Sequence, residues 1–124
     1  MAKLEISADK LSDVIVEAIQ DIKGEEIVKL DLREIENAVA QFFIICSGGS
    51  STHVSSIAGS VEKDVSKAVQ EKPWKVEGME NSEWVLLDYG NVVLHVFQRP
   101  VREFYRLEDL WADAERTVHD EELN

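Results

Sequence analysis

The stretch of this chain with the clearest chemical potential is Ser47–Ser51, which reads S-G-G-S-S. It follows directly on the apolar run Gln41–Cys46, which predicts a strand buried on both faces. A strand, a glycine turn and a helix N-terminus together favour anion binding, because backbone N–H groups and the helix dipole point at the ligand. The same residues also make an ordinary tight turn with a serine helix cap. We favour this simpler interpretation.

Metal-dependent chemistry at this turn would need carboxylates that the chain does not offer. Nucleotidyltransferases of the polymerase-beta type combine a Gly-Gly/Ser turn with two acids, spaced D-x-D or D-x-E on an adjacent strand, to hold two metal ions. Glu62 and Asp64 have this spacing but fall inside a predicted helix. Glu77 and Glu80 are spaced wrongly. We therefore predict no catalytic residues and no metal site, and expect no cofactor.

The histidines and the single cysteine do not form a recognisable site either. His53 lies in the first turn of a predicted helix, where we expect it to be solvated, and His119 lies near the C-terminus. His95 lies mid-strand between apolar neighbours, where a hydrogen-bonded structural histidine is the usual case. Cys46 lies in an apolar run and is expected to be a buried small hydrophobe. Scattered ligands of this kind do not indicate zinc.

The elements expected to position these residues are three helices and five strands. Apolar residues recur at helical spacing after Ser7 or Asp9, and Gly24 is a natural stop. The expected order is α-β-β-α-β-β-β-α, which implies an α/β fold with a mixed sheet flanked by helices. The elements expected after the first helix are strands at 26–32 and 41–46, a helix at about 52–71, a short edge strand at 74–76, a hairpin at 84–97, and one last helix from Pro100 through Ala114.

The hairpin carries polar residues that a generic core hairpin does not need. Its two apolar runs, Trp84–Leu87 and Val92–Phe97, flank a turn that reads D-Y-G-N. Glycine there supplies the positive φ that a reversal requires. Both faces of the second run are mostly apolar, so that strand is expected to be covered on both sides. Asp88, Tyr89 and His95 interrupt the pattern and are candidates for function.

Composition limits the class of partner. The chain has 124 residues, 44% of them hydrophobic, which is enough for one domain with a proper core. Its 25 acids and 13 bases give a net charge of −12, which repels nucleic acid and anionic membranes and favours a basic partner. Solubility alone is the simpler reading of that charge. No apolar run is long enough to span a bilayer, and no signal peptide is recognisable. We expect a cytoplasmic protein.

Aromatic residues near acids suggest an interaction surface. Trp84, Tyr89, Tyr105 and Trp111 each lie close in sequence to aspartate or glutamate. Aromatic side chains give large contact area at low entropy cost, and acids select a basic partner and speed its approach. The alternative is that the two tryptophans are ordinary core residues.

Four sequence blocks together resemble the ribosomal silencing factor family (RsfS, also called Iojap or YbeB). They cover nearly all of the chain from about Leu11 to Trp111. The blocks are D-I-K-G-E-E-I at 21–27, F-F-I-I-C-S-G-G-S-S-T-H-V at 42–54, E-G-M-E-N-S-E-W-V-L-L-D-Y-G-N-V-V-L-H-V-F at 77–97 and F-Y-R-L-E-D-L-W at 104–111. The resemblance implies a nucleotidyltransferase-like fold without the catalytic carboxylates.

The resemblance also implies a function. Family members bind the large ribosomal subunit through its protein L-fourteen and block joining of the small subunit, which represses translation; they are also linked to large-subunit maturation. Members are known as homodimers in isolation. A protein of this kind is not an enzyme. The alternatives from the residues alone are a nucleotide-binding or nucleotidyltransferase-type enzyme with diverged metal ligands, and a plain dimerisation module.

Matching the family's motifs residue by residue gives candidate partner-binding positions. Asn91 departs from the pattern, since an aspartate is common after the D-[LYF]-G turn. The chain also extends past Trp111. We expect one domain over residues 1–116 and an acidic flexible tail over 117–124. The candidate positions are Trp84, Asp88, Tyr89, His95, Tyr105, Glu108, Leu110 and Trp111.

Overall fold

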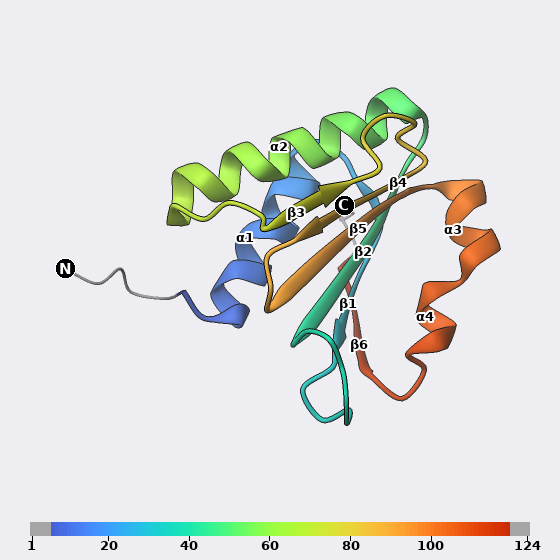
Figure 1. Ribbon diagram of the computed structural model, residues 1–124. Helices are drawn as coiled ribbons and strands as arrows, with labels where there is room; N and C mark the ends of the chain where they lie inside the picture. The colour runs from blue at the N-terminus through green and yellow to red at the C-terminus, as the bar shows by residue number, and fades with distance from the viewer. Residues whose placement is uncertain (1–5, 120–124) are drawn as a thin grey trace.

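A six-stranded mixed β-sheet forms the centre of the molecule, and helices cover both of its faces (Figure 1). The computed structural model describes residues 6–119. Strands lie across the sheet in the order β3-β4-β5-β2-β1-β6. The predicted fold class, a mixed sheet flanked by helices, is confirmed. The elements are α1 (Ala8–Asp21), β1 (Glu25–Asp31), β2 (Phe42–Gly48), α2 (Ser51–Val69), β3 (Lys75–Glu77), β4 (Trp84–Asp88), β5 (Val92–Gln98), α3 (Arg99–Tyr105), α4 (Leu107–Leu110) and β6 (Glu115–His119).

Strand pairing in the middle of the sheet follows from the connections. β2 and β5 run parallel, with Phe42 opposite Val92, as the crossover through α2 requires. β4 and β5 are antiparallel, with Trp84 opposite Phe97, which confirms the predicted hairpin. Gly90 in its turn has a φ of 92°, a left-handed conformation that glycine adopts without strain.

The two faces of the sheet bury two separate apolar clusters. On the face covered by α1 and α2, residues of those helices pack on alternate strand residues such as Ile44, Leu94 and Leu87. On the other face, Phe43, Phe97 and their neighbours pack against α3, α4 and the loop that connects β1 to β2. Every residue of β2 is buried, and all of β5 except its last residue, as predicted for strands covered on both sides.

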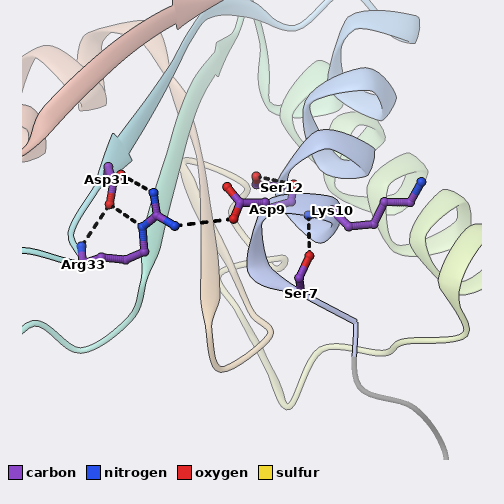
Figure 2. A network of polar contacts seen from close by, with 6 residues as sticks. All are labelled: Ser7, Asp9, Lys10, Ser12, Asp31 and Arg33. Carbon is purple, nitrogen blue, oxygen red and sulfur yellow. Dashed lines mark hydrogen bonds and ion pairs between the residues drawn. The ribbon is translucent and has the colours of Figure 1, made fainter.

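A polar network fixes the first turn of α1 against the end of β1 (Figure 2). The Ser7 hydroxyl accepts a hydrogen bond from the backbone N–H of Lys10 and so caps the helix. The Arg33 guanidinium donates to Asp31 at 2.7 Å and reaches Asp9 in the first helical turn at 3.4 Å. The bond from Arg33 holds the pKa of the Asp31 carboxyl below its usual value. The network ties the helix to the loop after β1.

The prediction of one continuous last helix is wrong. The chain forms two short helices, α3 and α4, separated at Arg106, which has a left-handed φ of 51°. Arg102 and Glu108 meet at 2.6 Å, although residues six apart in an unbroken helix point to different sides of it. The break therefore allows this contact, and the helical spacing of Leu107, Leu110 and Trp111 gives no sign of it.

The expected tail beginning at Thr117 is also wrong for its first three residues. Thr117, Val118 and His119 belong to β6, which pairs antiparallel with β1 at the edge of the sheet. The rest of that expected tail, residues 120–124, lies outside the described residues. The strand E-R-T-V-H has few apolar residues, because an edge strand exposes much of its surface.

Candidate protein-interaction surface

An aromatic cluster lies on the sheet face beside α3 and α4. The ring of Trp84 on β4 stacks on Phe97 of β5, with ring centroids 4.8 Å apart, and contacts Tyr105 of α3 at 4.7 Å. Phe43 of β2 contacts Trp111 at 5.7 Å. Aromatic pairs at such separations attract one another beyond the area that they bury. The structure therefore brings together three residues predicted from the sequence: Trp84, Tyr105 and Trp111.

His95 lies beneath this cluster and holds the indole of Trp84. The Nδ1 atom of His95 accepts a hydrogen bond from the Trp84 Nε1–H at 3.1 Å, so Nε2 carries the hydrogen of the neutral ring. The side chain is only 4% exposed, and Nε2 has no hydrogen-bond partner among the described residues. Burial lowers the pKa of His95 to about 4. At neutral pH it is an uncharged acceptor that orients Trp84, in agreement with the expected hydrogen-bonded strand histidine.

Apolar side chains on α3 and α4 point to solvent around the cluster. Phe104 is 78% exposed and Leu110 is 73% exposed, while Tyr105 is about half exposed. Together with half-buried Trp84 and Trp111 they form what we call the α3–α4 surface. Large exposed apolar groups on a small domain mark interaction sites when they are contiguous. Sequence reasoning missed Phe104, although neighbouring aromatics in a helix point about 100° apart and cannot both face one core.

Arg102 is a second residue that sequence reasoning missed. Its guanidinium is buried and donates to the backbone oxygen of Glu26 and to the Ser47 hydroxyl, each at 2.8 Å. It also donates twice to one Glu108 oxygen, at 2.6 and 3.1 Å. Burial of Glu108 opposes its ionisation, but the bonds from Arg102 outweigh this and keep its pKa below the usual value. Glu108, expected to touch a partner, is thus held in an internal ion pair.

Two other predicted residues, Asp88 and Tyr89, lie away from this surface. Asp88 ends β4 at the opposite end from Trp84, and its Oδ1 accepts from the Gly90 N–H at 2.8 Å, which closes the hairpin turn. The Tyr89 ring is buried in the cluster under α1 and α2. Burial, followed by the charges of Glu62 and Glu71, raises the pKa of its hydroxyl. The geometry gives Asp88 and Tyr89 roles in the turn and the core.

The glycine turn before α2 has its polar groups occupied from within the chain. The Gly49 N–H donates to Nδ1 of His53, and the backbone N–H of His53 donates to the Ser50 hydroxyl, both at 3.1 Å. Nε2 of His53 lies 3.0 Å from the Ile22 carbonyl oxygen at the end of α1. His53 is therefore not solvated as expected. It links the turn to α1, and the simpler reading of a turn with a helix cap fits these contacts.

The cysteine that precedes this turn is fully buried. Burial raises the pKa of the Cys46 thiol to about 12, which keeps it protonated. Within residues 6–119, no group of three or more His, Cys, Asp or Glu side chains is arranged to hold a metal ion.

Across the same part of the chain, no helix has the length and apolar character needed to cross a membrane.

Comparisons with known proteins identify the family. The family model described as ribosomal silencing factor during starvation matches residues 5–124. The chain belongs to the ribosomal silencing factor family. A ribosomal silencing factor of Halalkalibacterium halodurans is 39% identical over 109 residues, which are 88% of this chain and 92% of that protein. One from Bacillus subtilis is 41% identical over 98 residues, 78% of this chain and 80% of that protein.

A solved structure supports the same family fold. A crystal structure of a Chromobacterium violaceum protein superposes with a TM-score of 0.81 at 36% identity, covering 86% of this chain and 88% of that one. The resemblance drawn from the four sequence blocks is therefore confirmed.

Proposed function

We propose that this chain binds the large ribosomal subunit through ribosomal protein L-fourteen and sterically blocks joining of the small subunit. Membership of the ribosomal silencing factor family supports the general role. The observation that carries the binding site is the α3–α4 surface, where Phe104, Tyr105 and Leu110 are exposed beside Trp84 and Trp111. The net charge of −12 suits a basic protein partner. A role in large-subunit maturation belongs to the same proposal.

The proposed mechanism needs occupancy and no chemistry. A dissociation constant near 1 nM corresponds to a binding free energy of about −12 kcal/mol, enough to hold the subunit face against joining. The factor is then a cytoplasmic, non-enzymatic repressor without cofactors, which forms a homodimer when free. The internally bonded glycine turn supports this over a nucleotide-binding enzyme. Calorimetry with ATP and magnesium tests whether the chain binds a nucleotide. Clear binding would favour the alternative of a nucleotide-binding enzyme.

The site assignment is tested by co-sedimentation with separated ribosomal subunits and a subunit-joining assay. We expect the parent to migrate with the large subunit alone and to reduce joined ribosomes. Trp84→Ala should weaken binding about 30-fold or more, since buried aromatic anchors are worth about 2 kcal/mol or more. Leu110→Ser should also weaken binding, and it leaves the fold intact because that side chain is 73% exposed.

Trp74→Ala is the matched control, because Trp74 is also exposed but lies against Gly90 of the hairpin turn, at the end of β4 opposite Trp84. We expect this variant to bind the large subunit as the parent does. Folded Trp84 and Leu110 variants that bind as tightly as the parent would refute the site. A parent protein that binds neither subunit would refute the function.

A further inference from the structure

A surface cavity of about 610 Å³ lies between the helices α3 and α4 and the strands β1 and β6. Four of the chain's five arginines border it, whereas no lysine of the described chain does. Its volume falls within the range of about 300–1,000 Å³ that is usual for small-molecule sites. In a chain with a net charge of −12, this gathering of guanidinium groups is a local exception. The four arginines are Arg99, Arg102, Arg106 and Arg116.

Arg102 forms a fixed part of the cavity wall. Its side chain is buried, and its donors are occupied by Glu108, by the Ser47 hydroxyl and by the backbone oxygen of Glu26. A ligand could engage this guanidinium only by breaking a buried ion pair, which is costly. Arg102 therefore supports the site and is not one of its ligand-binding groups.

The other three arginines are exposed and available to a ligand. Arg99 pairs with Glu25 and Arg106 pairs with Asp109, in contacts that are open to solvent. Ion pairs of this kind are worth at most about 1 kcal/mol, so an anion can replace either carboxylate at little cost. Arg116 on β6 has no hydrogen-bond or ion-pair partner among residues 6–119. Three guanidinium groups from three different elements thus face one cavity.

Acidic side chains on the cavity rim decide the size of the ligand. Glu108 is neutralised by Arg102, while Glu26 and Glu103 are exposed at the rim. The cavity lining is formally neutral, with four acids and four arginines, but the chain around it is strongly acidic. A long polyanion such as RNA extends onto that acidic surface and is repelled. A compact anion stays within reach of the arginines.

The use of arginine points to phosphate groups. A guanidinium is a planar fork that matches two phosphate oxygens at once, which the single charge of a lysine does not. A phosphate monoester has three terminal oxygens, so three forks that each bind two oxygens need more than one phosphate group. We propose that this cavity binds a compact anion with two or more phosphate groups, held by Arg99, Arg106 and Arg116. The site goes beyond the proposed function and does not depend on ribosome binding.

Calorimetric titration with tripolyphosphate, in low salt and without metal ions, tests the site. The parent should bind tripolyphosphate about tenfold or more tightly than orthophosphate, because more forks are engaged. Arg116→Met and Arg99→Met should each weaken binding about tenfold, since each removes a charge-assisted contact. Arg116→Lys should lose less than Arg116→Met, because it keeps the charge and loses only the fork. Both side chains are exposed, so these variants should stay folded, which circular dichroism checks.

Arg33→Met is the matched control, because Arg33 is the one arginine of the chain that does not border the cavity. It removes the same charge and should bind tripolyphosphate as the parent does. A parent that does not bind, or that binds tripolyphosphate no tighter than orthophosphate, would overturn the proposal. So would Arg99 and Arg116 variants that bind as the parent does.

A short single-stranded RNA without a terminal phosphate distinguishes the two sources of phosphate. We expect it to bind at least about tenfold more weakly than tripolyphosphate, because the acidic surface repels it. RNA that binds more tightly, and loses affinity in Arg116→Met, would assign the arginines to an RNA backbone and overturn the compact ligand. Nucleotide binding that survives both arginine substitutions would lie outside the cavity, so the enzyme alternative is read separately.

Discussion

The contact between Trp84 and His95 joins the exposed aromatic surface to the buried sheet. The indole hydrogen is donated to a ring that is 4% exposed, so the orientation of Trp84 is fixed from below. The acceptor must be neutral, because a protonated imidazole has no lone pair to offer. The protonation state of one buried histidine is therefore coupled both to the orientation of Trp84 and to the stability of the fold.

This coupling predicts that stability falls with acidity. The unfolded chain binds a proton at His95 below about pH 6.5, whereas the folded chain does so only below about pH 4. The contribution of neutral His95 to the free energy of unfolding is complete above pH 6.5 and is lost as the pH falls through 4. The difference between the two pKa values corresponds to about 3 kcal/mol. Urea unfolding of the parent between pH 7 and pH 4 should show this decline.

The comparison variant is His95→Phe, which preserves a ring in the aromatic cluster and removes the titration. Because the carboxylates of Asp31 and Glu108 also have lowered pKa values, both proteins should lose stability in stronger acid. The difference between their free energies of unfolding should change by about 3 kcal/mol over this range. Equal pH dependence of the two proteins would show that His95 does not resist protonation in the folded state.

At the scale of the elements, the bend between α3 and α4 at Arg106, which we call the α3–α4 elbow, determines how the side chains of the α3–α4 surface face the solvent. Sequence patterns predicted the strands and the first two helices because their apolar residues recur with clear periods. They did not predict the elbow, since the spacing of Leu107, Leu110 and Trp111 fits a continuous helix. The break allows a tertiary contact, in which Arg102 binds Glu108, Ser47 and the Glu26 carbonyl together. Contacts between residues this far apart in the sequence leave no trace in the spacing of the apolar residues.

Arg102→Met should therefore loosen the elbow. It leaves Glu108 without its ion-pair partner and removes a donor from Ser47 and from the Glu26 carbonyl, a loss of about 3 kcal/mol or more for a buried pair. The four-residue helix α4 cannot hold its position by itself, so affinity for the large subunit should also fall. The two measurements are urea unfolding and co-sedimentation.

Arg106→Met is the matched control for this substitution. Arg106 pairs with Asp109 in a contact where both side chains are mostly exposed, which is worth at most about 1 kcal/mol. A charge reversal at Glu108 would test the elbow and not a direct partner contact, because that carboxylate is bound internally. Equal stability of the Arg102 and Arg106 variants would refute the structural importance of the buried network.

At the scale of the whole molecule, the sequence predicted a mixed α/β sheet and one edge of it, β3. It did not predict β6, because the residues E-R-T-V-H are polar and their strand forms only by pairing with β1. Part of the candidate site could be predicted from the sequence. The block containing Trp84 and the helix containing Tyr105 and Trp111 do converge, whereas Asp88 and Tyr89 are adjacent to that block in sequence yet lie at the far end of β4.

The acidic charge of the molecule should act on the rate of encounter, and the aromatic residues on the lifetime of the complex. Asp113 is exposed just after α4, whereas Glu17 lies on α1, which covers the opposite face of the sheet. The screening length is about 8 Å at physiological salt and grows to about 30 Å at 0.01 M, so a charge near the contact should matter more than one across the sheet. Asp113→Lys should slow association with the large subunit severalfold at low salt and have little effect at 0.5 M salt. Glu17→Lys should slow association less than Asp113→Lys does at low salt, and should have little effect at 0.5 M salt. Trp84→Ala should instead speed dissociation and leave the salt dependence of association intact. Stopped-flow or surface-binding kinetics across a salt series separate these effects. If Asp113→Lys and Glu17→Lys slow association equally, the α3–α4 surface is not the face that approaches the ribosome.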